Sequence, residues 1–211
     1  MGYSPSEADP DVWMRATIKP NGEECYEYVL TYVDDCLSVS HDPQSTMDEI
    51  GSDFQWKGDK VQPPETYLGA RLQEKILDGK RMWTMTSTDY VKTAVTTIEE
   101  RLHKRGLKMV SKAITPMSSN FVPELDSSPE LDADDITFFQ GMIGILRWAT
   151  EIGRVDILTE VSMMSQFQAS PRHGHLEEAF HIFAFLKKNP KLTLHFNPGL
   201  AKIDPNIFQD N

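Results

Sequence analysis

Cysteine, long hydrophobic runs and positive charge are all scarce in this 211-residue sequence. A hairpin would keep its two cysteines, Cys25 and Cys36, apart, so we expect reduced thiols and an intracellular, cytoplasmic protein. No apolar run approaches the ~18 residues that span a bilayer, and no basic-then-apolar leader begins the chain, so neither membrane insertion nor secretion is expected. The net charge of −11 argues against a protein that binds nucleic acid through its overall charge.

The residues that are present indicate a folded globular protein with an uneven distribution of charge. Hydrophobic residues make up 39% and charged residues 25% of the chain, which is enough for a real core. Acidic residues gather at 123–135, beside two prolines, and this pattern predicts a solvated linker. The basic residues gather in one cluster: Arg101, Lys104, Arg105, Lys108 and Lys112. This cluster either contacts phosphate or is simply favourable at the end of a helix.

The first half of the chain has the pattern of two β-hairpins. Residues 24–40 are rich in strand formers on both sides of Asp34–Asp35, which predicts a turn there, with Cys36 opposite Val33. Residues 67–86 predict a second hairpin around Asp78–Gly79, a strong turn dipeptide. Between the hairpins, residues 42–51 predict a short acidic helix that Asp42 caps and Gly51 stops.

The second half has the pattern of helices. Residues 87–106 form an amphipathic pattern in which apolar residues recur every three or four positions. Helical patterns return at 134–152, 155–169 and 175–189, before a short strand at 192–196. Hairpins followed by helices predict an α+β fold with segregated halves.

The adjacent carboxylates Asp34 and Asp35 present a choice between two interpretations. Neighbouring anions repel each other unless water screens them or a cation lies between them. The pair is therefore either an ordinary wet turn or half of a metal site. Strand formers on both sides would make the turn rigid, which suits a hard cation such as Mg²⁺.

Several phrases of the sequence occur in the order found in one known family. "YVDD" at 32–35, inside "YVLTYVDDCLSVS", resembles the catalytic hairpin of copia-type retrotransposon reverse transcriptases. The segments 2–13, 54–58, 67–73, 114–117, 138–157 and 175–188 also resemble that family, so the resemblance covers nearly the whole chain. It implies a partial palm at 1–84, a thumb region at 85–122, the acidic linker at 123–135, and a helical connection at 136–211 towards an RNase H domain.

The resemblance also implies roles for particular residues. Asp34 would bind the catalytic Mg²⁺ or Mn²⁺ directly, and Asp35 would assist. Residues implied to position the primer are Tyr32, Val33, Tyr67, Leu68 and Gly69. Residues implied to contact the nucleic-acid backbone are Arg101, Lys104, Arg105 and Lys108. Implied partners are an RNA or DNA template–primer duplex, a dNTP, and the fingers, RNase H and integrase domains of a polyprotein, in the cytoplasm or inside virus-like particles.

Other interpretations stay open beside these roles. The family's first catalytic aspartate and its fingers would precede Met1, so we expect the isolated chain to bind Mg²⁺ weakly and not to polymerise. A non-enzymatic remnant or a nucleic-acid-binding fragment is the alternative. Lys57 is either a proton donor to pyrophosphate or a solvated strand end. The histidines at 173, 175 and 181 fit surface or packing roles better than a zinc site, and Glu99, Glu100, Glu177 and Glu178 are expected to face water.

Overall fold

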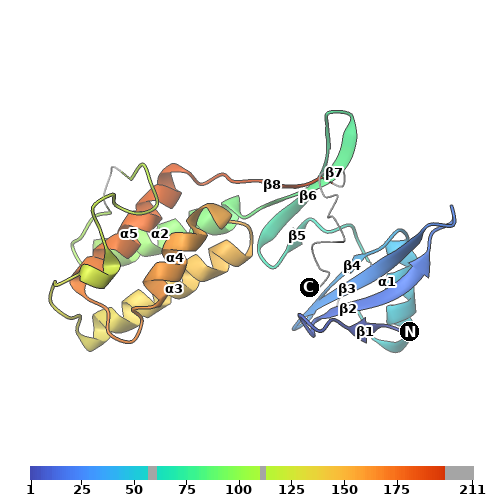
Figure 1. The fold of residues 1–211 in the computed structure, drawn as a ribbon, viewed down its shortest axis with the longest axis horizontal. Coiled ribbons are helices and arrows are strands. Elements are labelled where there is room, and N and C mark those ends of the chain that lie inside the picture. Colours follow the sequence, from blue (N-terminus) through green and yellow to red (C-terminus); the bar gives the residue numbers. More distant parts are fainter. Residues whose placement is uncertain (57–60, 110–112, 198–211) are drawn as a thin grey trace, which may run out of the picture. The chain divides into compact units, whose positions relative to one another are not determined.

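A computed structural model describes residues 1–56, 61–109 and 113–197 of the chain. It divides into two compact units, Met1–Leu68 and Gly69–Asn211, which are described separately below (Figure 1). Both units contain antiparallel strands, and helices supply most of the second. The predicted α+β class is confirmed. No helix within the described ranges is long and apolar enough to cross a membrane.

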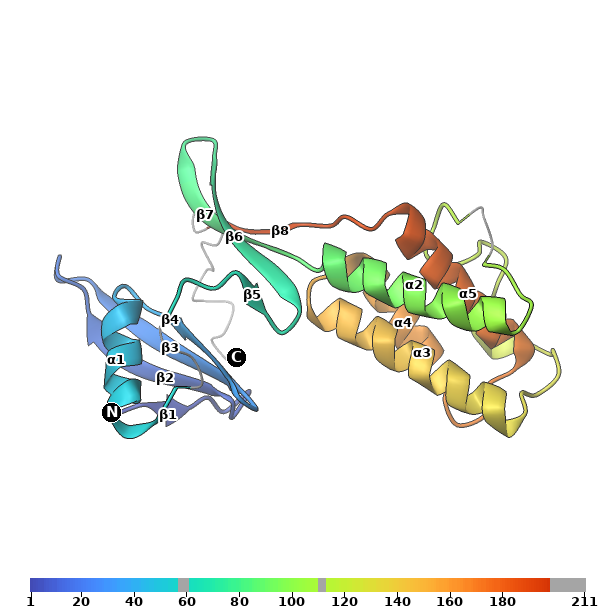
Figure 2. The same ribbon diagram turned by 180° about the vertical axis from the view of Figure 1, so that it is seen from behind.

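The first unit is an antiparallel sheet with one helix on one face. Its strand order is β1–β2–β3–β4, with β1 at Ser4–Pro5, β2 at Val12–Ile18, β3 at Glu24–Tyr32 and β4 at Asp35–Val39. Helix α1 (Pro43–Asp53) follows β4 and lies beside the sheet in both ribbon views (Figures 1 and 2). Arg15 of β2 joins the two layers, because its guanidinium donates to buried Glu27 of β3 (2.9 Å) and to Glu49 of α1 (2.8 Å).

The predicted turn of the first hairpin is wrong by one residue. Tyr32 pairs with Asp35, so Val33 and Asp34 form the turn, and Cys36 lies opposite Thr31 rather than Val33. Aspartate favours turns more than valine does, which is why local propensity predicts Asp34–Asp35. The observed register instead places Ser40 opposite Glu27, whose carboxylate accepts the Ser40 hydroxyl at 2.7 Å.

Helix α1 begins as predicted and ends later than predicted. Asp42 accepts a hydrogen bond from Ser45 N, which satisfies one of the free N–H groups at the helix start. Gly51 does not stop the helix, which continues to Asp53. A side chain at position 51 would meet the indole of Trp56, since a Cβ there would lie 2.6 Å from Nε1. The glycine therefore permits close packing of Trp56.

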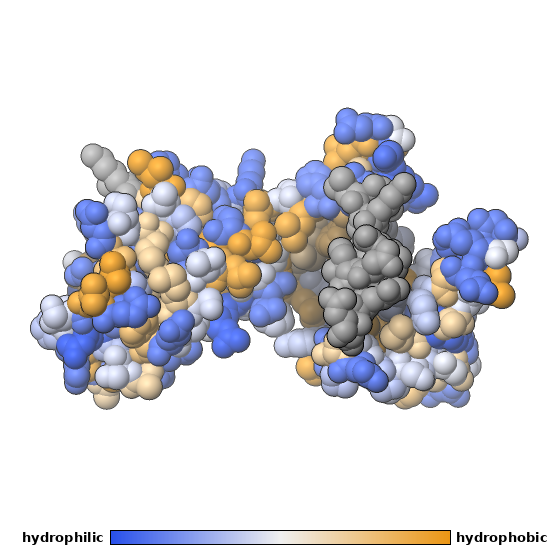
Figure 3. All heavy atoms as spheres, in the orientation of Figure 1, coloured by the Kyte–Doolittle hydropathy of each residue, from blue (hydrophilic) through white to orange (hydrophobic). Residues whose placement is uncertain are grey.

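The second unit begins with the predicted hairpin. Strands β6 (Ala70–Leu77) and β7 (Lys80–Thr86) are joined by Asp78–Gly79, both with positive φ, and this confirms the predicted turn. The short strand β5 (Thr66–Tyr67) ends the first unit just before the turn into β6. Strand β8 (Leu194–Phe196) pairs with β7 and brings the far end of the chain back to this sheet. The tip of the β6–β7 hairpin is hydrophilic, and hydrophobic residues show just below it in the view (Figure 3).

Helices around one hydrophobic core make up the rest of the second unit (Figure 2). They are α2 (Thr88–Lys104), α3 (Ala133–Glu151), α4 (Leu158–Ser165) and α5 (His173–Lys188), with short 3₁₀ turns at Pro123–Leu125 and Val155–Ile157. Ile98 of α2, Leu146 of α3 and Phe183 of α5 are fully buried in this core. Arg154 and Asp156, between α3 and α4, form the ion pair that their spacing permits, with N–O distances of 2.8 and 2.7 Å.

The acidic segment 123–135 is anchored at a few points, while Glu124, Glu130, Asp132 and Asp134 are exposed, and its role as a linker stays a prediction. Pro123 is buried, and its carbonyl lies 3.0 Å from the Nε2 of buried His175 in α5. Asp126 accepts hydrogen bonds from the backbone and hydroxyl of Ser128, while Gly174 N donates to that hydroxyl (2.8 Å). A Cβ on Gly174 would lie 2.4 Å from Asp126 Oδ2. The start of α5 therefore holds this segment.

Hydrogen bonds also control the ionisation of Asp126. Burial by itself would raise the pKa of the carboxyl. The hydrogen bonds from Ser128 and the nearby His175 outweigh burial, so the pKa lies below its usual value. Asp126 is accordingly held as a carboxylate where the segment meets α5.

The division into units differs in position from the predicted palm boundary at 84. The second hairpin belongs to the compact unit that contains the helices, because β6 contacts α2 and β8 returns from beyond α5. The names palm, thumb and connection stay predictions.

Candidate functional site

The tip of the β3–β4 hairpin presents both motif carboxylates to solvent. Asp34 is the second turn residue and Asp35 is the first residue of β4, and both are exposed. Val33, the first turn residue, has φ 56° and a side chain that is 97% exposed. A β-branched residue rarely adopts this conformation. The turn is therefore held by the strands on either side and not by the preference of Val33.

Tyr67 lies near the same tip, within the first unit. Burial raises the pKa of its hydroxyl, and the negative charge of Asp35 adds to the rise. Of the predicted primer-positioning residues, Tyr32 and Val33 lie at the tip itself, and Tyr67 lies in β5 of the same unit. Leu68 and Gly69 form the following turn, both with positive φ (52° and 87°).

The chemistry of the tip suits a hard cation. Asp34 and Asp35 offer carboxylate oxygens, which are the ligands that Mg²⁺ and Mn²⁺ prefer. The neighbouring thiol of Cys36 is half-buried, and burial raises its pKa, so it stays protonated and is a poor ligand for a soft metal. Within the described ranges, no group of three or more His, Cys, Asp or Glu side chains is arranged to hold a metal ion. The tip therefore supplies two carboxylates, and a complete two-metal site needs others.

The basic cluster forms the C-terminal end of α2 and the loop after it. Arg105 is paired with Asp135 of α3, and its guanidinium lies 4.7 Å from the centre of the Phe138 ring. Arg101 lies 5.7 Å from the same ring. Lys104 and Lys108 are exposed, and neither forms an ion pair with another described residue. Lys104 and Lys108 are therefore more available to an anion than the two arginines. Lys57 and Lys112 lie outside the described residues.

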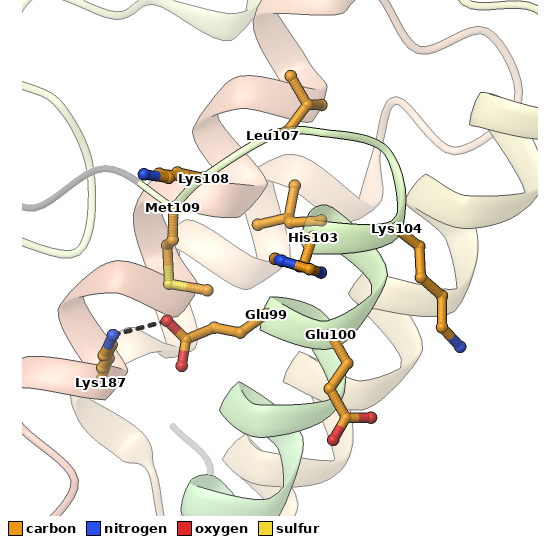
Figure 4. A pocket seen from close by; sticks show the side chains of 9 residues that line it. Glu99, Glu100, His103, Lys104, Leu107, Lys108, Met109 and Lys187 are labelled. Carbon is orange, nitrogen blue, oxygen red and sulfur yellow. Dashed lines mark hydrogen bonds and ion pairs between the residues drawn. The ribbon is translucent and has the colours of Figure 1, made fainter.

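A second basic element near this cluster was missed by sequence reasoning. Lys187 of α5 donates to Glu99 of α2 at 2.6 Å, and it lines a depression with Lys108 (Figure 4). Positions 99 and 187 are 88 residues apart, so only the packing of α2 against α5 brings them together. The lysines in the last turn of α5 were the one signal in the sequence for this contact. Cations are favourable at the C-terminal end of any helix, so the lysines did not point to a site.

The histidines have surface or packing roles, as predicted. His175 is 2% exposed, stacks on Phe167 with centroids 4.2 Å apart, and accepts a hydrogen bond at Nδ1 from Arg172 N. His181 Nε2 lies 3.0 Å from the carbonyl oxygen of Thr115. His173 is exposed.

One of the acids expected to face water is instead buried. Glu178 is 4% exposed and accepts a hydrogen bond from Ser118 N at 2.6 Å, so its predicted exposure is wrong. The carboxylate satisfies a backbone donor from the loop before the acidic segment. Glu177, the next residue on α5, is exposed as predicted.

Comparison with known proteins relates the chain to retrotransposons. A Saccharomyces cerevisiae protein named for transposon Ty5-1 is 24% identical over 202 residues, which cover 94% of this chain and 59% of that protein. The Retrovirus-related Pol polyprotein from transposon RE1 of Arabidopsis thaliana is 26% identical over 178 residues, or 82% of this chain and 11% of the polyprotein. The chain spans less than two thirds of either relative. No family model and no solved structure matches it.

These similarities support a chain derived from a retrotransposon polyprotein, with a Pol polyprotein among its relatives. The expected relationship to retrotransposons is confirmed at this level. The reverse transcriptase activity and the roles of individual residues belong to the proposal that follows.

Proposed function

We propose that this chain is part of a copia-type reverse transcriptase, an RNA-directed DNA polymerase that acts by two-metal nucleotidyl transfer. One observation carries the proposal: the adjacent carboxylates of "YVDD" lie exposed at the tip of a two-stranded hairpin, in a chain related to a Pol polyprotein. Exposure at a fixed tip is what a metal site shared with substrate phosphates requires.

Each residue at the tip has a defined part in the proposed reaction. Asp34 holds Mg²⁺ or Mn²⁺, and Asp35 assists from the first position of β4. A bound metal would stabilise the charge on the dNTP triphosphate and lower the pKa of the primer hydroxyl. Tyr32 and Val33 place the primer end against the carboxylates, and Tyr67 holds the same end from the neighbouring segment.

The remaining contacts in the proposal are made by the loop at Leu68–Gly69 and by α2. The positive φ of Gly69 suits close approach of a backbone to the primer. Arg101, Lys104, Arg105 and Lys108 contact the phosphates of the template–primer duplex. The fingers, RNase H and integrase domains of the polyprotein are the proposed protein partners, and the cytoplasm or a virus-like particle is the proposed location.

Metal binding is the first test of this proposal. Titration of the chain with Mn²⁺ is expected to broaden the NMR resonances of residues 32–36, because a paramagnetic ion relaxes nearby nuclei. Asp34→Asn should abolish the broadening, whereas Asp53→Asn, an exposed acid of α1, should leave it unchanged. Equal broadening in the Asp34→Asn chain would contradict a metal site at the tip.

Polymerase activity is the second test. The isolated chain is expected to be inactive, and the chain joined to the upstream Pol segment of the same element is expected to extend a primer. Asp34→Asn should then lower the rate by more than ~100-fold, since loss of a mere supporting group around a metal costs 10–100-fold. Extension by the isolated chain would overturn the expected dependence on an upstream segment.

A non-enzymatic nucleic-acid-binding fragment is the second candidate. It is favoured because the described residues supply only two carboxylates at the tip, which is too few for a two-metal site. Phosphate binding needs cations, and the end of α2 already presents them. Oligonucleotide binding without primer extension in the joined protein would support this candidate.

A further inference from the structure

A depression between α2 and α5 is lined by lysines from both helices. The proposed duplex contact, in contrast, uses cations of α2 and the loop after it only. The volume of the depression is about 560 Å³. Figure 4 shows Lys187 and Glu99 facing each other on one side, with Lys108 and Met109 on the loop above them. We call it the α2–α5 trough and define it by the nine residues that line it, among them Glu99, Glu100, Lys104, Leu107, Lys108, Met109 and Lys187.

The trough has an apolar lining as well as charge. Leu107 is 50% exposed and Met109 is half-buried, so both offer hydrophobic surface. The fully buried Leu102 lies behind them. A bare inorganic anion would gain nothing from this surface, whereas a nucleotide has an apolar sugar and base next to its phosphate. The lining therefore favours a nucleotide over a simple ion.

The ion pair between Lys187 and Glu99 is exchangeable. The side chains are 56% and 37% exposed, and exposed pairs of this kind contribute little to stability. Lys187 can leave Glu99 for a phosphate without loss of a buried contact. Lys108 forms no ion pair with the described part of the chain, so it is available from the loop above this pair (Figure 4).

The two sides of the C-terminal end of α2 differ in how firmly their cations are paired with carboxylates. On the α3 side, Arg105 is already bound to Asp135, and Asp134 lines the same surface. On the α5 side, the carboxylates that line the trough are Glu99, in an exposed pair with Lys187, and Glu100, which forms no ion pair with another described residue. An incoming phosphate displaces less on the α5 side.

We propose that the α2–α5 trough binds one nucleotide unit of a nucleic-acid strand. Its phosphate lies between Lys108 and Lys187, and its sugar or base packs on Leu107 and Met109. Glu99 holds Lys187 in place and competes with the phosphate. The inference rests on the proposed function, because it takes nucleic acid as the ligand, and it adds α5 to the contact surface.

The test uses variants that change affinity in opposite directions. The probe is a fluorescein-labelled oligothymidylate of about twelve nucleotides, and its Kd for the full chain is measured by fluorescence anisotropy at several NaCl concentrations. Lys187→Gln should weaken binding ~3- to 10-fold and lower the slope of log K against log salt by about 0.7. Glu99→Gln should strengthen binding ~2- to 5-fold, because it releases Lys187.

Matched controls separate local contacts from net charge. Lys92→Gln removes one positive charge from α2 outside the trough, and Glu177→Gln removes one exposed negative charge from α5. Neither should change Kd by more than ~2-fold, because exposed charges beyond a Debye length are screened. Equal effects from Glu99→Gln and Glu177→Gln would overturn the inference, since only overall charge would then matter.

The remaining outcomes distinguish the inference from the function on which it rests. If Arg101→Gln, on the α3 side of α2, weakens binding and the variants at 99 and 187 do not, the inference is wrong and the α2 contact stands. If no oligonucleotide binds, both are wrong. If polyglutamate displaces the probe with equal affinity and with the same response to the variants, the trough takes an acidic polypeptide and the inference is overturned.

Discussion

At Val33 the backbone adopts a conformation that a β-branched side chain disfavours. Its φ of 56° belongs to the left-handed region, which costs a β-branched residue about 1–3 kcal/mol. Its side chain is 97% exposed and so contributes no packing that would offset this cost. The turn is stabilised by the pairing of β3 with β4, including Leu30 opposite Leu37.

Val33→Asn is expected to stabilise the first unit by about 1 kcal/mol, because asparagine tolerates left-handed φ. Chemical denaturation followed by circular dichroism measures the change. Val39→Asn is the control, since Val39 is also exposed but lies in a regular strand, where valine is preferred. A loss of stability in Val33→Asn would show that the valine makes a contact of its own.

At the scale of elements, glycines that look alike in the sequence have opposite roles. Gly144 lies in the middle of α3 with open space around its missing Cβ. Gly174 lies in the first turn of α5, and a Cβ there would collide with the carboxylate of Asp126. The first glycine weakens its helix, and the second allows the acidic segment to dock.

Gly144→Ala is expected to raise the free energy of unfolding by about 0.5–1 kcal/mol, the usual cost of glycine inside a helix. Gly174→Ala is expected to lower the free energy of unfolding, because Asp126 must leave its hydrogen bonds to Ser128. Urea denaturation of the two variants measures both signs. Equal effects at the two positions would contradict the docking of the acidic segment on α5.

Elements with strong local signals could be predicted from the sequence. The Asp78–Gly79 turn, the cap at Asp42 and the amphipathic stretch of α2 each depend on neighbours in the chain, and each is present. Contacts across long separations could not be predicted. Thr86 donates to the Leu192 carbonyl across 106 residues, and no local pattern encodes such a bond.

The candidate site likewise has features that could be predicted from the sequence and features that could not. "YVDD" was visible as a motif, but the position of its turn depends on Ser40 meeting Glu27 across the hairpin. The cations of α2 were visible as a cluster, but Lys187 joins them only because α5 packs against α2. Acidic composition suggested solvent exposure for 123–135, and most of its acids are exposed, but the hydrogen bonds that hold Asp126 near a histidine of α5 could not be predicted.

At the scale of the whole molecule, the two units differ in core and in charge. The large hydrophobic cluster lies entirely within the second unit, whereas the buried hydrophobic residues of the first are few, Val29 and Met47 among them. Residues 1–68 contain fourteen acidic and four basic side chains, so most of the net charge of −11 belongs to the first unit. Self-repulsion and a small core both lower the stability of that unit.

We therefore expect the first unit to unfold at a lower urea concentration than the second. Hydrogen exchange with mass spectrometry follows peptides from each unit separately. Ile98→Ala, which empties a fully buried site, should lower only the later transition, by about 2–5 kcal/mol. Val29→Ala should lower only the earlier one. One shared transition that responds to both variants would show that the units fold as a single cooperative body.

The contact of Gly174 with Asp126 also has a consequence for the history of the gene. Every single-base change in a glycine codon that alters the residue yields either a stop codon or an amino acid with a Cβ. At position 174 each of those amino acids would meet the carboxylate of Asp126. Transposable elements leave many copies, and copies under no selection collect such changes freely. We therefore expect selection for a stable product to retain glycine at codon 174, and copies that have escaped selection to lose it.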